Sequence, residues 1–375
     1  MVTKLNVLAL NWRDIKNPEA GGAEIHLHEI MRALVKRGHS VTQLASSFPG
    51  CEDTVTVDGI EVLRRGKWYA ANFTLPLAYL RELRSRKFDV VVEDINKIPF
   101  YMPLFTRAPV LAIVPHLFGT TVFQEASFPF AMYVYSYERL VPAVYRGVRF
   151  LAISESTKRD LTARGIKPER VSVVECGLDH DLYRPLPVQR DEKLIVYLGR
   201  LRKYKCVHFV IQAMKPVRER VPGARLVVVG DGPYRRNLEA LASSLGLSDA
   251  VEFRGHVTQD EKVRLLSQAA VTANPSPKEG WGLTVVEANA CGVPVVASRS
   301  PGLVDSVRDG QTGLLVEHGS VEQLAGKLVE ILVDRGLRER LSAGAIEWAQ
   351  QFSWDKCGAL SAGVIEEVAG AQQRR

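Results

Sequence analysis

The stretch VTANPSPKEGWGLTVVEA, residues 271–288, decides the fold class. Its first three residues belong to a short segment, residues 270–273, typical of a buried strand, and Thr284 opens a run with helical character. A proline-containing loop and the Gly280-Trp281-Gly282 turn lie between them. A buried strand followed by a loop and a helix is the repeating unit of a parallel sheet covered by helices.

The same alternation extends in both directions along the chain. Strands are expected at 4–10, 40–45, 89–92, 109–114, 148–153 and 171–174, then at 194–198, 226–229, 251–254, 270–273, 293–297 and 313–316. Helices are expected at 22–37, 74–86, 130–145, 155–164, 322–333, 337–350 and 354–368. The pattern predicts an α/β protein with two Rossmann-like, doubly wound parallel-sheet domains.

A proline-containing segment, residues 181–190, interrupts the alternation and is interpreted as a linker. It separates an expected N-terminal domain, residues 1–185, from a C-terminal domain, residues 186–353. Ligands of such sheets bind beyond the carboxyl ends of the strands. We therefore expect a cleft between the domains and seek site residues directly after the predicted strands.

Composition narrows the class of protein. The 375 residues are 46% hydrophobic and 24% charged, which excludes disordered and fibrous proteins. No apolar run approaches the ~20 residues of a membrane-spanning helix, and polar Asn11 follows too early for a signal peptide, so a cytoplasmic protein is expected. Five cysteines without a C-x-x-C pair disfavour a disulfide framework and a zinc cluster. The net charge of +7 permits an anionic partner, whether nucleic acid, phospholipid or phosphorylated substrate.

Three strand ends carry candidate site residues. Gly22, at the start of the first expected helix, would let a phosphate approach the helix amides, or it serves only turn geometry. His116 could donate to a hydroxyl or transfer a proton, or it is a structural histidine. After Gly199, Arg200 and Lys205 suit a diphosphate, the alternative being a solvated basic loop.

Two further motifs are weighed and set aside. The Gly230-Asp231-Gly232 sequence follows a strand, but Arg235 stands where a dinucleotide fingerprint has its third glycine, so NAD is rejected. Asp179-His180-Asp181 resembles a metal-binding D-x-D triplet but lies in the linker. We interpret it as a polar linker and expect no metal site.

Glu279 and Glu287 flank the glycine turn of the opening stretch. Each carboxylate can accept two hydrogen bonds from a vicinal diol, while amides at the helix N-terminus can hold a diphosphate. A sugar, a ribose and a diphosphate fit this layout. The alternative is that both glutamates are solvated charges.

A basic segment in the first half suggests a surface partner. Arg81, Arg84, Arg86 and Lys87 lie in an expected helix, and Trp68 and Tyr69 precede it among further basic residues. Basic residues interleaved with aromatic ones suit an anionic membrane surface. A solvated helix face explains the same charges.

In combination these segments resemble the retaining glycosyltransferases of family 4, which have the GT-B fold. The resemblance rests on Gly21-Gly22, residues 37–41, Ser154, Gly177-Leu178-Asp179, Gly199-Arg200 with Lys205, Gly230-Asp231-Gly232-Pro233, the E-x7-E pair Glu279 and Glu287, and Phe352-Ser353-Trp354. It implies that the last segment, residues 354–375, forms a helix that packs back on the N-terminal domain.

The resemblance also implies roles for individual residues. It assigns catalysis to His116, Glu279, Arg200 and Lys205, and acceptor binding to Asn11, Trp12, Glu24 and His116. Donor binding falls to Gly22, Gly199, Arg200, Lys205, Gly230, Arg254, His256, Val257, Glu279, Gly280, Trp281, Gly282, Leu283, Thr284 and Glu287. The chain departs from the family pattern at Cys176, Cys206 and Trp281, where Asn, Gly and Phe are common.

The implied function is retaining, metal-independent transfer of a hexosyl group from a UDP- or GDP-sugar to a hydroxyl. The acceptor would be a lipid-linked or cell-envelope glycan, and the enzyme would need no cofactor and could bind the cytoplasmic membrane face peripherally. One alternative is a sugar-nucleotide epimerase of the same fold. The other is a basic nucleic-acid-binding protein, but no recognisable nucleic-acid module is present, so no such partner is expected.

Overall fold

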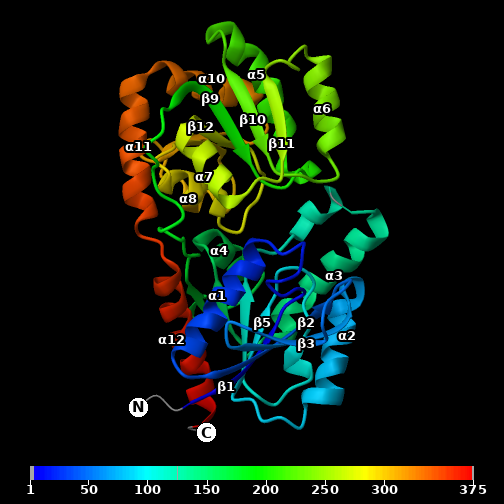
Figure 1. Cartoon of the computed structure of the whole chain (residues 1–375). Coiled ribbons are helices and arrows are strands. Elements are labelled where there is room, and N and C mark those ends of the chain that lie inside the picture. The colour runs from blue at the N-terminus through cyan, green and yellow to red at the C-terminus, as the bar shows by residue number, and fades with distance from the viewer. Residues whose placement is uncertain (1–3, 125, 374–375) are drawn as a thin grey trace. The chain divides into compact units, whose positions relative to one another are not determined.

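The computed structural model describes residues 4–124 and 126–373, which form two compact units (Figure 1). Unit 1 comprises the chain up to Gly177 together with the segment from Trp354 onward. Unit 2 comprises Leu178 to Ser353. The expected α/β class with two mainly parallel sheets is confirmed.

Unit 1 contains an eight-stranded sheet with the order β3-β4-β2-β1-β5-β6-β7-β8. Its strands are β1 (Asn6–Leu10), β2 (Ser40–Ser47), β3 (Thr54–Val57), β4 (Ile60–Lys67), β5 (Val90–Asp94), β6 (Val110–Val114), β7 (Arg149–Ala152) and β8 (Val171–Val173). Its main helices are α1 (Gly22–Lys36), α2 (Ala71–Ala78), α3 (Phe128–Val144), α4 (Glu155–Ala163) and α12 (Trp354–Gln373). All strand pairs are parallel except β3 with β4.

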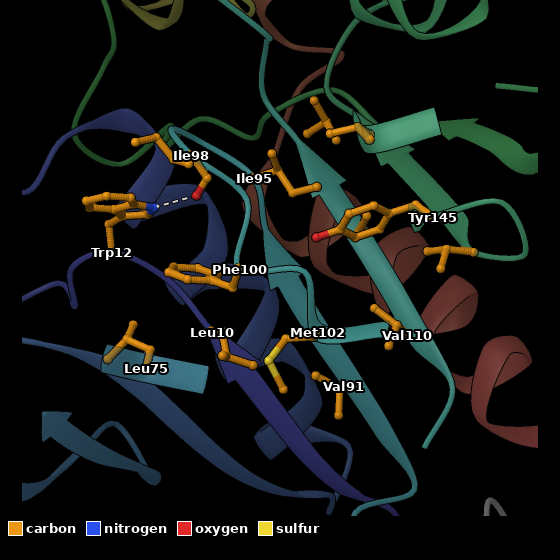
Figure 2. Packing of buried hydrophobic residues seen from close by; sticks show 14 of the residues in the cluster. Leu10, Trp12, Leu75, Val91, Ile95, Ile98, Phe100, Met102, Val110 and Tyr145 are labelled. Atoms are coloured by element: carbon orange, nitrogen blue, oxygen red, sulfur yellow. Dashed lines mark hydrogen bonds between the residues drawn. The ribbon is translucent and has the colours of Figure 1, made fainter. Parts of the chain in front are cut away.

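The sheet of unit 1 is covered on both faces. Leu8 and Leu10 of β1 belong to one buried apolar cluster, part of which Figure 2 shows. Val7 and Ala9 belong to a second cluster that includes residues of α1 and α12. Because successive side chains of a strand point to opposite faces, this alternation places apolar helices on both sides. Consecutive apolar residues in β1 and β5 are therefore what a parallel central strand requires.

The β3–β4 hairpin is the main element that the sequence analysis missed. Asp58 and Gly59 connect the strands with φ angles of 49° and 81°, a backbone that suits an Asp-Gly turn. Arg64, read from the sequence as part of a basic cluster, lies in β4 and is buried. The helix expected at 74–86 also differs, because α2 ends at Ala78 and a single π-helical turn, Tyr79–Leu83, follows it.

Unit 2 contains a six-stranded parallel sheet with the order β11-β10-β9-β12-β13-β14. Its strands are β9 (Asp191–Leu198), β10 (Arg225–Val229), β11 (Val251–Gly255), β12 (Ala269–Asn274), β13 (Val295–Ser298) and β14 (Gly313–Val316). Its helices are α5 (Val207–Arg220), α6 (Arg235–Ser244), α7 (Gln259–Gln268), α8 (Leu283–Ala290), α9 (Leu303–Ser306), α10 (Val321–Val333) and α11 (Arg335–Ala349). This strand order is that of the Rossmann fold, with a topological switch point between β9 and β12.

The two units join at 177/178 and 353/354, so the first junction precedes the expected boundary at residue 185. The reason is visible in the hydrogen bonds of the linker. The Tyr183 hydroxyl donates to Gln259 Oε1 over 3.1 Å, and the Leu186 amide donates to Ser267 Oγ over 3.2 Å. Both partners lie on α7, so the linker packs as part of unit 2.

Candidate functional site

The loops after β9 and β10 pack closely at the switch point of unit 2. A Cβ on Gly230 would lie 2.1 Å from the carbonyl oxygen of Gly199, and one on Gly232 would lie 2.4 Å from that of Leu201. Neither position accepts a side chain. The Gly-x-Gly sequence after β10 therefore permits close contact between the two loops.

Lys205 and Glu279 form a largely buried ion pair at this switch point. Lys205 Nζ lies 2.6 Å from Oε1 and 2.8 Å from Oε2 of Glu279, and each side chain is only 16% exposed. Burial by itself lowers the pKa of Lys205, but the charge and hydrogen bonds of Glu279 outweigh it and raise that pKa. Lys205 is therefore a cation whose partner an incoming anion can replace.

The backbone around Glu279 is held in place. The Glu279 amide donates to the Pro301 carbonyl over 2.9 Å, and a Cβ on Gly302 would lie 2.2 Å from the Glu279 carbonyl oxygen. Gly282, with a φ of 91°, is the N-cap of α8 and offers no side chain to the first amides of that helix. Leu283 and Thr284 are the first residues of α8 and follow Glu279 closely in the sequence. Amides at the start of a helix can bind an anion.

Glu287, the second glutamate of the pair, also has a lysine partner. Lys262 Nζ lies 2.8 Å from Glu287 Oε2, and the two side chains are 15% and 14% exposed. Sequence reasoning missed Lys262 and its neighbour Tyr183. No local signal could have found them, because neither motif nor spacing connects α7 or the linker with α8.

The remaining donor-site candidates of unit 2 divide into exposed and buried groups. Arg200, Arg254 and His256 are exposed, and Arg254 pairs with Glu252 and with Glu261 at 3.3 Å. Trp281 is buried, with its ring centroid 5.1 Å from that of Phe352. Val257 and Gly280 are partly exposed. Trp281 therefore packs in the interior against Phe352 and does not project into solvent.

A buried polar cluster occupies the corresponding switch point of unit 1, between β1 and β5. Asn11 Nδ2 donates to Asp94 Oδ2 over 2.9 Å, and Asn96 Nδ2 donates to Asn11 Oδ1 over 3.0 Å. Glu24 accepts from the Gly21 amide over 2.8 Å. Burial and the charge of Glu24 raise the pKa of Asp94 well above its ordinary value. Asp94 and Asn96 were missed, although their position at and after the end of β5 was a usable signal.

The acceptor-site candidates Trp12 and His116 differ in their exposure. Trp12 is 4% exposed, its indole N–H donates to the Ile98 carbonyl over 3.0 Å, and its ring packs on Phe100 (Figure 2). It is a core residue that shapes the loop after β5. His116 is partly exposed after β6, and its loop is held by buried Glu138, which accepts from the Phe118 and Gly119 amides.

The basic candidates of unit 1 lie on its surface. Arg81 lies in the π-helical turn, while Arg84, Arg86 and Lys87 follow it, and all four are exposed. Arg86 pairs with Glu61 at 2.6 Å. Trp68, Tyr69 and Phe73 precede them with 57%, 62% and 56% of their surface exposed. None of the helices within residues 4–124 and 126–373 has the length and apolar character to cross a bilayer.

Metal-binding groups do not gather in the described part of the chain. No three histidine, cysteine, aspartate or glutamate side chains in that part converge in a way that could hold a metal ion. Asp179, of the D-x-D triplet, instead accepts hydrogen bonds from the Asp181 and Leu182 amides. The triplet therefore forms a turn at the start of the linker.

Comparison with known proteins gives a consistent result. A model described as Glycosyltransferase Family 4 matches residues 20–182, and one described as Glycosyl transferases group 1 matches residues 181–348. The chain is 30% identical over 369 residues to the GDP-mannose-dependent alpha-(1-6)-phosphatidylinositol monomannoside mannosyltransferase of Mycobacterium tuberculosis. That alignment covers 91% of this chain and 94% of the relative.

Solved structures share the fold across nearly the whole chain. Sucrose-phosphate synthase from Thermosynechococcus elongatus is similar with a TM-score of 0.83 at 21% identity, covering 98% of this chain and 100% of that one. HepE from Anabaena, solved with UDP and glucose, is similar with a TM-score of 0.77 at 18% identity, covering 97% and 100%. The likeness confirms the fold class predicted from the sequence.

Proposed function

This chain belongs to the group 1 glycosyltransferases, and we propose that it transfers a hexosyl group from a nucleoside diphosphate sugar to an acceptor hydroxyl. The Lys205–Glu279 ion pair carries the proposal. Glu279, the carboxylate of this pair, lies three residues before Gly282, the N-cap of α8, which provides no side-chain cap hydrogen bond. The donor diphosphate would take Lys205 from Glu279, and the freed carboxylate would accept from hydroxyls of the sugar.

The proposed chemistry is retaining and metal-independent. As the glycosidic bond breaks, negative charge grows on the leaving diphosphate, and Lys205, Arg200 and the first amides of α8 would stabilise it. The leaving phosphate oxygen would accept the proton of the acceptor hydroxyl, so we assign no protein nucleophile. His116 would hydrogen-bond to the substrates at the reacting centre.

The donor nucleotide is proposed from the relatives. The name of the Mycobacterium tuberculosis relative specifies GDP-mannose and a phosphatidylinositol mannoside. We therefore rank a GDP-linked hexose first and a UDP-linked one second. The acceptor would be a lipid-linked glycan bound by unit 1.

A lipid-linked acceptor would bring the enzyme to the cytoplasmic face of a membrane. The exposed rings of Trp68, Tyr69 and Phe73 suit the headgroup layer. The ring centroids of Phe73 and Tyr133 lie 6.5 Å apart, which extends this aromatic surface from α2 to α3. The basic residues that follow α2 supply attraction to anionic lipid.

A vesicle-binding assay tests the membrane contact. Changing Arg81, Arg84, Arg86 and Lys87 together to glutamine should lower binding to phosphatidylglycerol vesicles, because each basic residue near the surface contributes about 1 kcal/mol. The matched control changes four exposed arginines of unit 2 to glutamine, namely Arg220, Arg225, Arg335 and Arg340. If the two variants bind phosphatidylglycerol vesicles equally well, the proposed membrane contact is refuted.

A donor screen tests the function itself. Thermal shift with GDP-, UDP-, ADP- and dTDP-sugars should show stabilisation by one nucleotide class, because a ligand that binds the folded state raises its melting temperature. Incubation of that donor with the enzyme and a lipid-linked mannoside should then yield a glycosylated lipid. Epimerised donor formed without any acceptor would overturn the proposal in favour of an epimerase.

A further inference from the structure

Tyr183, in the linker, contacts the lysine that pairs with Glu287. Lys262 Nζ donates to the Tyr183 hydroxyl over 2.6 Å and lies 4.9 Å from the centroid of the tyrosine ring. The hydroxyl in turn donates to Gln259 Oε1 over 3.1 Å. Tyr183 is only 6% exposed, whereas Lys262 is partly exposed and Gln259 lies at the surface.

The chemistry of these groups is well defined. Burial and the nearby charge of Glu287 raise the pKa of Tyr183, so its hydroxyl stays neutral and can donate and accept at once. Lys262 has no acceptor capacity; its ammonium donates to Tyr183 and forms an ion pair with Glu287. The result is a relay from Gln259 through Tyr183 and Lys262 to the Glu287 carboxylate.

The relay leaves one side of Glu287 open. Its Oε2 atom lies 2.8 Å from Lys262 Nζ as an ion pair, accepts no hydrogen bond and has essentially no contact with solvent, whereas the Glu287 side chain as a whole keeps 14% exposure. The remaining exposure therefore belongs to other atoms of the side chain, which leaves Oε1 as the oxygen for a ligand. A carboxylate held by one oxygen presents the other in a defined direction.

The relay also joins two parts of the donor site. Gln259 and Lys262 lie in α7, which begins shortly after the donor-site candidates Arg254, His256 and Val257 at the end of β11 and beyond it, and we assign these candidates to the base. Glu287 lies in α8, and we assign it to the ribose diol of the donor. Anchoring both to Tyr183 would keep the base and ribose contacts in one geometry.

We propose that Tyr183 and Lys262 are positioning residues for the nucleoside half of the donor, holding Glu287 so that its Oε1 atom accepts from the ribose diol. This inference rests on the proposed function of Glu287. Neither residue touches the reacting atoms. Their loss would weaken donor binding and leave the rate at saturating donor nearly unchanged.

The test compares nucleotides with and without the diol. Tyr183→Phe removes one oxygen atom from the relay, and calorimetry would measure its binding to GDP, UDP and their 2′,3′-dideoxy analogues. Because hydrogen bonds to charged groups are among the stronger ones, we expect affinity for the better ribonucleotide to fall by about fivefold. Affinity for its dideoxy analogue should fall by less than about twofold, since that ligand offers Glu287 nothing to bind. Lys262→Met should show the same pattern with a larger loss.

Tyr79→Phe is the matched control. Tyr79 is also 6% exposed, and its hydroxyl makes one hydrogen bond, to Thr106 Oγ1 over 3.0 Å in unit 1. Its removal should leave both affinities unchanged. The KM for the donor should rise in Tyr183→Phe while kcat stays within about twofold, because only binding is uniformly weakened.

Two results would overturn the inference. If Tyr183→Phe loses as much affinity for the dideoxy analogue as for the ribonucleotide, the tyrosine supports unit 2 generally. If it loses none for either, the relay has no effect on Glu287. By contrast, failure of the unaltered protein to bind any nucleoside diphosphate would refute the proposed function and would be seen before any variant is made.

Discussion

The switch points of the two units have the same place in their sheets but opposite electrostatics. In unit 2 both glutamates have a lysine partner, at 2.6 Å for Glu279 and 2.8 Å for Glu287. In unit 1 the corresponding position holds Asp94 and Glu24 in hydrogen bonds with asparagines and a backbone amide. Burial, above all, and the charge of Glu24 raise the pKa of Asp94 well above its ordinary value.

The ion pairs of unit 2 and the polar cluster of unit 1 suit different ligands. A lysine that can leave its glutamate is prepared for an anionic ligand, since the anion replaces one charged partner with another. A buried cluster of amides and carboxyl groups offers directional hydrogen bonds without a net positive charge. We therefore associate the first with the donor diphosphate and the second with a polyhydroxylic acceptor.

The largest expected effect comes from removing the cation of unit 2. Lys205→Met should lower kcat by about 100-fold or more, because preorganised charge at a developing anion typically contributes that much. The measurement is the transfer rate at saturating donor, with folding checked by thermal melting. Lys262→Met, which removes the other lysine, is the control and should change mainly KM. A kcat within a few-fold of the unaltered value for Lys205→Met would end the diphosphate assignment.

An intermediate effect is expected on the pH dependence of stability when Asp94 of unit 1 is replaced. A carboxyl group whose pKa is higher in the folded than in the unfolded state costs stability as pH rises from the unfolded pKa, near 4, through the folded one. The change that Asp94→Asn causes in the free energy of unfolding should therefore be more favourable at pH 8 than at pH 5, by about 1 kcal/mol. A pKa difference of one unit corresponds to about that amount. Urea unfolding at both pH values measures this.

The carboxylate of Glu61 provides a control for that prediction. The Glu61 side chain is more exposed than that of Asp94. Partial burial acts to raise the pKa of Glu61, but its hydrogen bonds to Arg86 and Thr42 outweigh this and lower that pKa. Glu61→Gln should therefore reduce stability at pH 8 and have less effect at low pH, the reverse of the expected result for Asp94→Asn. The same sign for both variants would show that Asp94 is ionised in the folded protein.

The smallest effect concerns the backbone of the unit 2 site. Cys206, directly after Lys205, has a φ of 54°, a left-handed conformation that glycine adopts more readily than other residues. Cys206→Gly should stabilise the protein by less than about 1 kcal/mol, because relief of the left-handed strain exceeds the added chain entropy only slightly. Cys206→Ala keeps the strain and should give no gain. Equal melting temperatures of the glycine and alanine variants would show that the loop is unstrained.

Much of the fold was predictable because it depends on local pattern. The apolar runs of β1, β5, β6 and β12 are continuous, as central parallel strands require, and each was placed within a few residues. The β3–β4 hairpin was missed because its Asp58-Gly59 turn was overlooked and its basic residues suggested a surface cluster. Trp12 could not be recognised as a core residue, since its partners Ile98 and Phe100 are more than eighty residues away in the chain.

The α/β class, the two sheets and the candidates that follow strands, among them Lys205, Glu279 and Glu287, could be predicted from the amino-acid sequence. These follow from hydrophobic period and glycine placement, which are properties of neighbouring residues. Only the tertiary structure decided which side chains meet: Lys205 with Glu279, Lys262 with Tyr183 and Glu287, Asp94 with Asn11. Such partners depend on strand order, and the physical reason is that packing brings together residues separated by dozens of positions, whose charges then set each other's ionisation.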